Sequence, residues 1–119
     1  MGFDRKSIDI KKNFQMPIFR YLDGYSVFFK VTPLERVKTF KKDISNLKFS
    51  NQHYAKYILY LGYLLNEKEL PPEAKDHGLK GKWSGYREFH ISGDLILIYK
   101  IQDETLYLLR IGSHSQLFE

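Results

Sequence analysis

The chain has 119 residues, of which 43% are hydrophobic and 16% aromatic, a composition that suits one domain with a single core. It contains no cysteine, which excludes a disulfide framework, a thiolate zinc site and a cysteine nucleophile. The net charge of +5 and the isoelectric point near 9.3 favour a polyanionic partner, of which nucleic acid is the commonest.

The sequence shows neither the apolar core of a signal peptide nor a run of about 18 apolar residues. A soluble, cytoplasmic protein is therefore expected. The charge is unevenly distributed, because residues 1–60 hold 12 Lys and Arg against 5 Asp and Glu, whereas residues 61–119 hold 7 against 9. Three of the four histidines lie in this second half. We expect polyanion binding from the first half and histidine chemistry from the second.

The N-terminal segment has no regular hydrophobic period. Pro17 and Gly24 interrupt residues 1–24, which we interpret as an extension that precedes a domain of residues 25–119. The following stretch, YSVFFKVT, is rich in β-branched and aromatic residues and predicts a strand over residues 25–32.

Two helices are expected next. Thr32 and Pro33 have the pattern of an N-cap followed by proline at the first helical position, and they predict a helix over residues 33–49. Its basic residues are Arg36, Lys38, Lys41, Lys42 and Lys48. A second helix, over residues 51–70, is predicted to end before two prolines. Its apolar stripe comprises Tyr54, Ile58, Leu61 and Leu65, widened by Tyr57 and Leu64.

The rest of the chain has the pattern of strands. They are predicted over residues 77–83, 86–91, 95–101 and 105–111. Residues 95–101 are nearly all apolar, which indicates a central strand. The order of elements predicts an α+β fold in which two N-terminal helices pack on one face of a mainly antiparallel sheet of four to five strands.

Polar side chains gather at the ends of these strands. His90 and Asp94 flank the turn SGD and are neighbours in any antiparallel hairpin, and Arg110 and His114 lie at the end of the last strand. His77 begins the first strand of the run. We expect these side chains at one edge of the sheet, although sequence leaves the register open.

Three imidazoles, a carboxylate and a guanidinium suit proton transfer at a phosphodiester. RNA supplies its own nucleophile, the 2′-hydroxyl, so the protein needs a base, an acid and a cation that stabilises the phosphorane. Histidine suits both proton transfers because it titrates near neutrality. This chemistry requires neither a metal nor a cofactor.

Each residue also has a structural interpretation. The histidines could be packed or surface residues, Asp94 a turn residue, and Trp83 a half-buried platform. Arg110 could pair with Glu88 on a neighbouring strand. The three histidines and Asp94 also form an acceptable zinc ligand set, which is less favoured because no two histidines have local ligand spacing.

Two stretches carry a recognisable set of motifs. They are KDHGLKGKWSGYREFHISGDLILIYK and LLRIGSHSQLF. They contain, in order, Asp-His-x-Leu-x-Gly, Arg-x-x-His, an Asp that heads a strand ending in Ile-Tyr, and a terminal Arg-x-Gly-Ser-His-x-x-Leu-Phe. Over residues 75–118 the chain thereby resembles the YafQ branch of the RelE-type bacterial toxins. The strand and helices from residue 25 to residue 70 fit the family's order but have no diagnostic motif.

The resemblance implies a RelE-like fold and a function. Members of the family are small ribosome-dependent endoribonucleases, or mRNA interferases, that cut mRNA in the A site of the 70S ribosome. Each is neutralised by an antitoxin that is usually encoded beside it. The expected partners are thus a small cognate antitoxin, mRNA and ribosomal RNA, with no metal, cofactor or membrane.

The resemblance also implies roles for individual residues. The catalytic set carried over by motif is His77, His90, Asp94, Arg110, His114 and Phe118. By analogy His114 is the general acid, and Asp94 is the general base, with help from His90 or His77. Arg110 stabilises the phosphorane, and Phe118 stacks on or orients a base.

Substrate binding is expected from basic residues beside this set. The residues are Lys80, Lys82, Trp83 and Arg87, together with Lys38, Lys41 and Lys42 of the basic helix, which would hold ribosomal RNA. The sequence departs from the family at Leu95, where some relatives have tryptophan. The alternative hypothesis is a catalytically weak homologue that acts as an RNA- or antitoxin-binding module.

Overall fold

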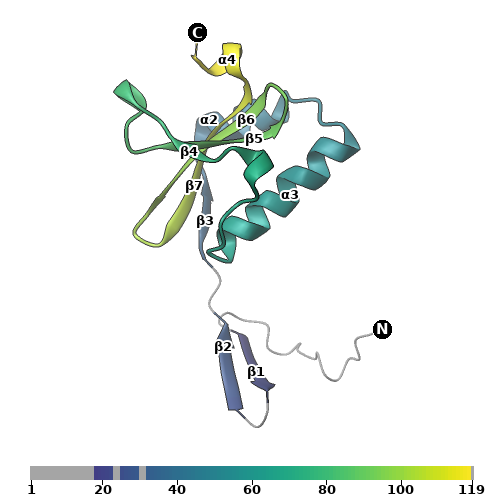
Figure 1. Cartoon of the computed structure of the whole chain (residues 1–119), viewed down its shortest axis with the longest axis vertical. Coiled ribbons are helices and arrows are strands. Elements are labelled where there is room, and N and C mark those ends of the chain that lie inside the picture. Colours follow the sequence, from purple (N-terminus) through teal and green to yellow (C-terminus); the bar gives the residue numbers. More distant parts are fainter. Residues whose placement is uncertain (1–17, 23–24, 30–31, 119) are drawn as a thin grey trace. The chain divides into compact units, whose positions relative to one another are not determined.

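The computed structural model describes residues 18–22, 25–29 and 32–118, with side chains from residue 32 onward (Figure 1). The chain divides into two compact units, residues 1–31 and 32–119. Of the predicted extension, residues 1–17 and 23–24 lie outside the described residues. Strand β1 (Ile18–Leu22) pairs in antiparallel fashion with β2 (Tyr25–Phe29) in a two-stranded sheet. Of the strand predicted over residues 25–32, residues 25–29 therefore pair with β1 and belong to a sheet separate from the five-stranded one, and residues 30–31 lie outside the described residues.

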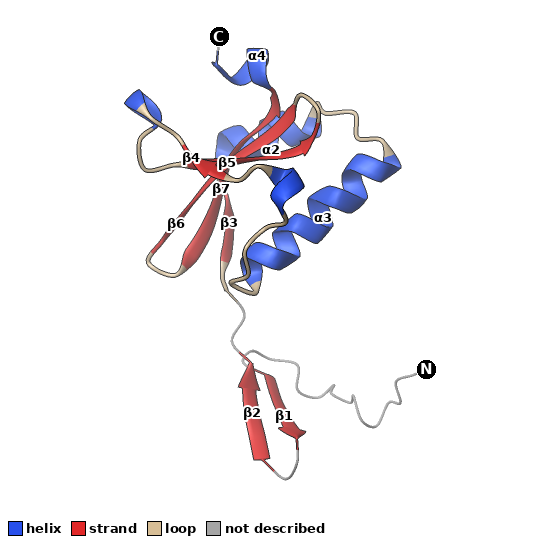
Figure 2. Cartoon of the chain, viewed as in Figure 1, coloured by secondary structure: helices blue, strands red, loops and turns tan. Residues whose placement is uncertain are grey.

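The second unit is built around a five-stranded sheet. Its strands are β3 (Leu34–Arg36), β4 (His77–Gly78), β5 (Arg87–Ser92), β6 (Leu95–Gln102) and β7 (Thr105–Ser113). Their order is β3-β7-β6-β5-β4, so β6 is central, as its apolar sequence predicts (Figure 2). Strand β3 runs parallel to β7 and every other pair is antiparallel. The fold is α+β, and the sheet is mixed.

The helix predicted over residues 33–49 is shorter than expected, and its first turn is wrong. Leu34–Arg36 forms β3, and helix α2 spans Lys38–Ser45. The backbone N–H of Leu106 donates to the carbonyl of Pro33 at 2.9 Å, and that of Val37 donates to Leu108 at 3.1 Å. Pairing with a strand some seventy residues away thus replaces the local helical signal.

Helix α3 (Asn51–Leu65) begins as the sequence predicts but ends earlier. The side chain of Ser50 caps it by accepting the N–H of His53 at 3.0 Å. Its C-terminus closes when the N–H of Lys68 donates to the carbonyl of Tyr63 at 2.8 Å, with Glu67 in the left-handed region at φ 58°. This capping geometry stops the helix before the prolines.

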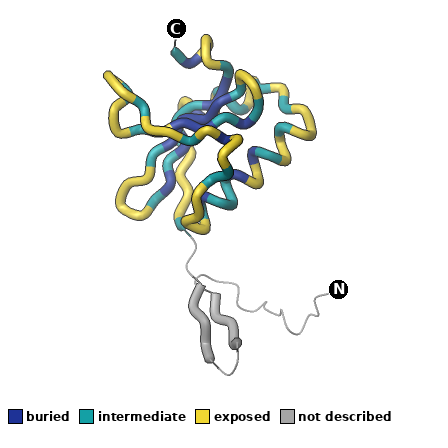
Figure 3. Tube along the Cα trace, in the orientation of Figure 1, coloured by how far each residue is buried: buried dark blue, intermediate teal, exposed yellow. Residues whose placement is uncertain are grey.

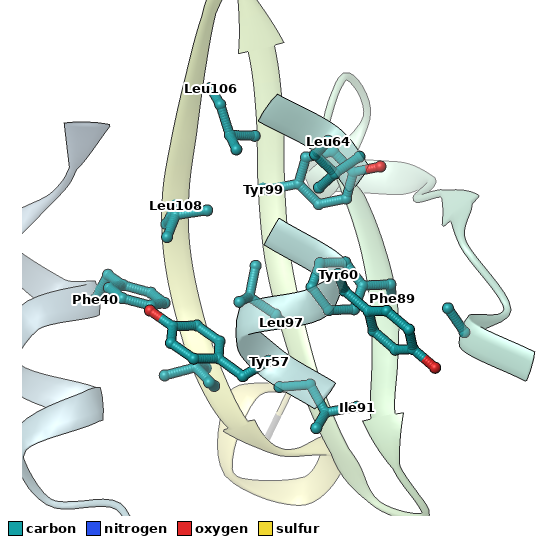
Figure 4. Close-up of a cluster of buried hydrophobic side chains, with 12 residues drawn as sticks. Phe40, Tyr57, Tyr60, Leu64, Phe89, Ile91, Leu97, Tyr99, Leu106 and Leu108 are labelled. Carbon is teal, nitrogen blue, oxygen red and sulfur yellow. The ribbon is translucent and has the colours of Figure 1, made fainter. Parts of the chain in front are cut away.

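The main core lies between the two helices and one face of the sheet (Figure 3). Tyr57, Tyr60 and Leu64 of α3 project onto the strands toward Phe89 and Leu97, beside Phe40 of α2, as Figure 4 shows. The predicted stripe on α3 is partly wrong, because Tyr54 and Ile58 are 50% and 52% exposed. The buried face of the helix is rotated toward Tyr57 and Tyr60.

The strand predicted over residues 77–83 is also wrong beyond its first two residues. Strand β4 ends at Gly78, and Gly81–Trp83 forms a single 3₁₀ turn. Gly81 adopts φ +66°, a conformation that extended strands do not use and that glycine adopts without strain. The segment is therefore a loop that carries Trp83.

The opposite face of the sheet has a smaller apolar cluster. Ile96 and Ile98 of β6 pack there with Leu117 of the C-terminal helix α4 (His114–Phe118). Neither α2 nor α3 contributes a residue to this cluster, and we refer to this side as the helix-free face. Among the described residues, none of the helices has the length and apolar character needed to cross a bilayer.

Candidate active site

The strand register places three polar side chains together on the helix-free face. His77 of β4 lies opposite Glu88 of β5, and His90 follows two residues later on the same face. The residues between them alternate to the other face, where Phe89 joins the main core. The proximity of His77 and His90 is thus produced by two adjacent strands.

Glu88 joins the two imidazoles. Its Oε2 lies 3.3 Å from Nε2 of His77 and 3.6 Å from Nε2 of His90, and the ring centroids are 6.5 Å apart. The other ring nitrogens also face oxygens, with Nδ1 of His77 2.7 Å from the carbonyl of Lys75 and Nδ1 of His90 3.3 Å from that of Gly93. Each ring is therefore oriented by contacts at both of its nitrogens.

Glu88 is the residue that sequence reasoning missed. It is 4% exposed and is the one buried charged residue among those the structure describes. Its Oε1 has no hydrogen-bond partner among the described residues, a costly arrangement for a buried carboxylate. Glu88 and His90 are two residues apart on one strand, so the sequence could have shown that they share a face of the sheet. That His77 lies opposite Glu88 became apparent only from the strand register.

Lys75 and Asp76, the two residues that precede His77, take part in a second group of polar contacts. Asp76 Oδ1 accepts a hydrogen bond from the Tyr99 hydroxyl at 2.7 Å and another from Nε of Arg87 at 3.2 Å. Lys75 adopts the left-handed conformation at φ 51°, and its carbonyl lies within hydrogen-bond distance of Nδ1 of His77. Because β4 has only two residues, these contacts supply much of the restraint on the His77 ring.

Replacing Tyr99 by phenylalanine tests this second group of polar contacts. Burial, followed by the hydrogen bond to Asp76, raises the pKa of Tyr99, so the fold favours the neutral phenol. Tyr99→Phe is expected to lower the free energy of unfolding by about 1.5–3 kcal/mol at neutral pH, because it removes a hydrogen bond to a charged group. The stabilisation from this phenol persists below about pH 10 and declines above it. Urea unfolding of both proteins at pH 7 and pH 10.5 should show the difference narrowing; a constant difference would contradict it.

Local hydrogen bonds build helix α4 at the end of β7. Ser113 Oγ accepts the N–H of Gln116 at 3.2 Å, and Gln116 Oε1 accepts the N–H of Ser113 at 2.9 Å. This reciprocal pair is a capping box. Asp94 Oδ1, from the β5–β6 turn, accepts the backbone N–H of His114 at 3.2 Å. Asp94 and His114 are thus joined through the backbone N–H of His114.

Aromatic contacts continue from α4 into the β4–β5 loop. The rings of His114 and Phe118 lie 4.7 Å apart, and Phe118 meets Trp83 edge-on at 5.8 Å. Leu117, which precedes Phe118 in the chain, is buried against Ile96 and Ile98 of the sheet. His114 itself is exposed, with its ring near Phe118.

Gly112 leaves room for this helix, and its replacement provides a test. A Cβ at Gly112 would lie 3.0 Å from Gln116 Oε1 and 3.3 Å from Leu117 Cδ2. Gly112→Ala is expected to cost about 1–3 kcal/mol of stability and to displace α4, with a larger fractional loss of cleavage than of folded protein. Gly62→Ala is the matched control, because nothing lies within 4 Å of a Cβ there. Thermal unfolding and cleavage assays should separate the two; equal activity would contradict the placement of α4.

Arg110 is engaged by helix α2. Its Nε and Nη2 donate to the two carboxylate oxygens of Asp43 at 2.6 and 3.1 Å, and Asp43 Oδ2 also accepts the N–H of Ile111 at 3.1 Å. These hydrogen bonds raise the pKa of Arg110, which stays charged. The alternative pairing with Glu88 is wrong, since Glu88 contacts the two histidines.

The predicted substrate-binding residues fall into separate groups. Lys80 and Lys82 are exposed on the loop that carries Trp83, and Trp83 is half-buried. Lys38, Lys41 and Lys42 are exposed on α2. Arg87 pairs with Asp76 and lies opposite Tyr99 of the main core, so it is on the other face of the sheet from His90.

The alternative zinc ligand set is not assembled in the described part of the chain. No group of three or more histidine, aspartate or glutamate side chains among those residues has the arrangement needed to hold a metal ion. The two histidines nearest to each other are bridged by a single carboxylate, that of Glu88.

Comparisons with known proteins agree with this architecture. Residues 32–119 match the family model for the bacterial toxin of type II toxin–antitoxin systems, YafQ. The YafQ protein of Haemophilus influenzae is 43% identical over 86 residues, covering 66% of this chain and 84% of that protein. The mRNA interferase toxin YafQ of Escherichia coli K12 is 38% identical over 81 residues, covering 66% and 87%.

A solved structure extends the likeness to three dimensions. The toxin chain in the E. coli DinJ–YafQ toxin–antitoxin complex superposes with a TM-score of 0.64 at 36% identity, over 72% of this chain and 96% of that one. The match to the family model, over residues 32–119, includes the five-stranded sheet, both core helices and the C-terminal helix. The chain therefore belongs to the YafQ family of type II toxin–antitoxin toxins.

Proposed function

We propose that this protein is the toxin of a type II toxin–antitoxin pair and acts as a ribosome-dependent endoribonuclease on mRNA. The supporting observation is that the backbone N–H of His114 at the start of α4 bonds to Asp94, which directly follows Gly93, the residue whose carbonyl lies 3.3 Å from Nδ1 of His90. The name mRNA interferase belongs to the E. coli relative, and the 38% identity over 81 residues supports the same activity for this chain.

Cleavage proceeds by attack of the 2′-hydroxyl on the adjacent phosphorus. Asp94 takes the proton from that hydroxyl, and His114 protonates the departing 5′-oxygen. His114 suits this role because its ring is exposed, so it can reach a phosphodiester. Phe118, packed against that ring, provides a surface on which a neighbouring base stacks.

The phosphorane is stabilised by the imidazoles of His77 and His90 and by the guanidinium of Arg110. Each imidazole of the pair His77 and His90 has an oxygen within 3.6 Å of each ring nitrogen, which fixes the orientation of the ring. Glu88 contacts both rings. Arg110 is held by two hydrogen bonds to Asp43, which fixes the plane of its guanidinium.

RNA is held by the exposed lysines. Lys80 and Lys82 precede Trp83 on the same loop, and they contact the message. Lys38, Lys41 and Lys42 on α2 contact ribosomal RNA, whose binding is salt-dependent and independent of sequence. Arg87 restrains Asp76 and does not contact RNA.

The partner that restrains the toxin is an antitoxin. The E. coli relative has been solved in complex with the antitoxin DinJ, and the likeness of fold supports an equivalent complex here. A small cognate antitoxin, encoded next to this chain, would neutralise it by binding before it reaches ribosomes.

Mapping the 5′ ends of cellular mRNA after induced expression tests the function. The expected result is growth arrest together with new 5′ ends at a recurring position within codons, restricted to translated regions. Mutating the start codon of a reporter message should remove its cuts, because ribosomes no longer read it. Cuts that persist in the untranslated reporter would reject ribosome dependence, and normal growth with soluble protein would favour the binding-module alternative.

A further inference from the structure

The helix-free face carries a continuous series of ring and cation contacts leading away from His114. After Phe118 and Trp83, the series passes to Tyr86 at 5.6 Å from the Trp83 ring. The ammonium of Lys100 then lies 5.3 Å from the centre of the Tyr86 ring and 5.6 Å from that of Tyr107. We call Phe118, Trp83, Tyr86, Lys100 and Tyr107 the aromatic track.

The members of the track share one face because of strand alternation. Lys100 lies two residues beyond Ile98 on β6, and the register sets it opposite Tyr107 on β7. Trp83, Tyr86 and Phe118 pack against Ile96 and Ile98 from the same side. The track therefore crosses the sheet from α4 toward the β6–β7 hairpin.

Its side chains remain accessible. All five are only partly buried, whereas the aliphatic residues beneath them at Ile96 and Ile98 are fully buried. Helices α2 and α3 pack on the opposite face, so in the described part of the chain no helix other than α4 contributes to this face. The track is thus a row of half-exposed rings supported from below.

The charge along the track selects the kind of ligand. Lys100 lies near two tyrosine rings, and the exposed Lys80 and Lys82 precede Trp83 on the same loop. Rings that accept stacked bases, interspersed with cations that meet phosphates, are the pattern of single-strand nucleic-acid surfaces. A duplex offers no exposed base faces to such rings.

We propose that the aromatic track binds single-stranded RNA, namely the stretch of message that adjoins the cleaved bond. The proposal rests on the proposed function, because the track begins at the His114–Phe118 pair. Bases stack on Trp83, Tyr86 and Tyr107, and Lys100 meets the backbone between them. Tyr86, Lys100 and Tyr107 thereby become substrate-binding residues.

Trp83 is the only tryptophan of the chain, so its fluorescence reports on the track without labelling. The full-length protein is titrated with a single-stranded oligoribonucleotide whose 2′-hydroxyls are methylated, which prevents cleavage. Quenching of Trp83 emission is expected, and a duplex of the same sequence should quench far less. Circular dichroism and thermal unfolding establish that each variant is folded.

Two variants examine the distal end of the track, where they leave His114 untouched. Tyr107→Leu keeps a strand-compatible apolar residue and should weaken oligonucleotide binding about tenfold, the cost of one lost stacking contact. Lys100→Gln should reduce the salt dependence of binding by about 0.7 in log–log slope, the contribution of one phosphate contact to a single strand. Tyr54→Leu and Lys68→Gln, both at exposed positions outside the helix-free face, are matched controls and should bind as the wild type does.

Three outcomes overturn the proposal. The first is that the oligonucleotide does not change Trp83 emission. The second is that Tyr107→Leu and Tyr54→Leu bind the oligonucleotide equally well. The third is that Trp83 emission changes with the antitoxin but not with the oligonucleotide, which would assign the face to a protein partner. Failure of the proposed function is distinguishable. If the protein cleaves mRNA on ribosomes but does not bind the oligonucleotide, only the proposed role of the aromatic track is rejected. If it binds the oligonucleotide but cleaves nothing on ribosomes, the nuclease function is rejected and the role of the track is retained.

Discussion

His114→Gln is expected to abolish ribosomal mRNA cleavage while the protein stays folded. The loss should be about 10²–10⁴-fold in rate, the usual contribution of one general acid, because glutamine cannot donate a proton at neutral pH. Stability should change little, since the His114 side chain is exposed and its backbone N–H, which bonds to Asp94, is retained. Single-turnover cleavage on programmed ribosomes measures the effect.

The matched control for this prediction is His53→Gln. His53 is the one histidine outside the motif set and lies in the first turn of α3. It should cut at close to the wild-type rate. If His114→Gln also cut at that rate, the general acid would have to be another residue, and the pH dependence of His77 and His90 variants would be the next measurement.

Asp43→Asn is expected to reduce both stability and cleavage. The carboxylate of Asp43 accepts two hydrogen bonds from Arg110 and one from the backbone of Ile111, and asparagine retains only one oxygen for them. Because the pair is partly exposed, a loss of about 1–3 kcal/mol in unfolding free energy is expected, less than for a fully buried ion pair. Cleavage should fall further than the folded fraction does, since Arg110 is no longer held.

A double-mutant cycle distinguishes positioning from a purely structural role. If Asp43 acts on catalysis through Arg110, the turnover of Asp43→Asn combined with Arg110→Gln should equal that of Arg110→Gln alone. Multiplicative losses would mean that Asp43 acts independently of Arg110. Unfolding curves of all four proteins keep the stability and rate effects separate.

The two predictions concern different parts of the same C-terminal stretch. Arg110 lies within β7 and is hydrogen-bonded to Asp43 of α2, whereas His114 begins a helix that packs on the helix-free face. Deleting residues 112–119 is therefore expected to abolish cleavage, and it also removes Leu117, a buried member of the smaller apolar cluster. The cost in stability should resemble that of one large-to-small core substitution, about 2–5 kcal/mol. A truncated protein that still cut RNA would place the site elsewhere.

Much of this protein is determined by its local sequence. Alternation and apolar runs located strands β5, β6 and β7, and the helical period located the start of α3, because side-chain periodicity depends only on near neighbours. The capping box that begins α4, Ser113 to Gln116, is equally local, although no helix was predicted over residues 114–118. The motifs that indicated the family are also short stretches of local sequence, so they could be recognised without the tertiary structure.

Contacts between distant segments required the tertiary structure. Leu34–Arg36 has a helical signal, yet it forms a strand because β7 offers a parallel edge. Asp43 lies 67 residues from Arg110, and Glu88 meets His77 only in one strand register. Sequence patterns record which face a side chain occupies but not which partner faces it, since the register is set by the packing of the whole sheet. The chemistry of each residue was thus evident from the chain, and its partner was decided by the fold.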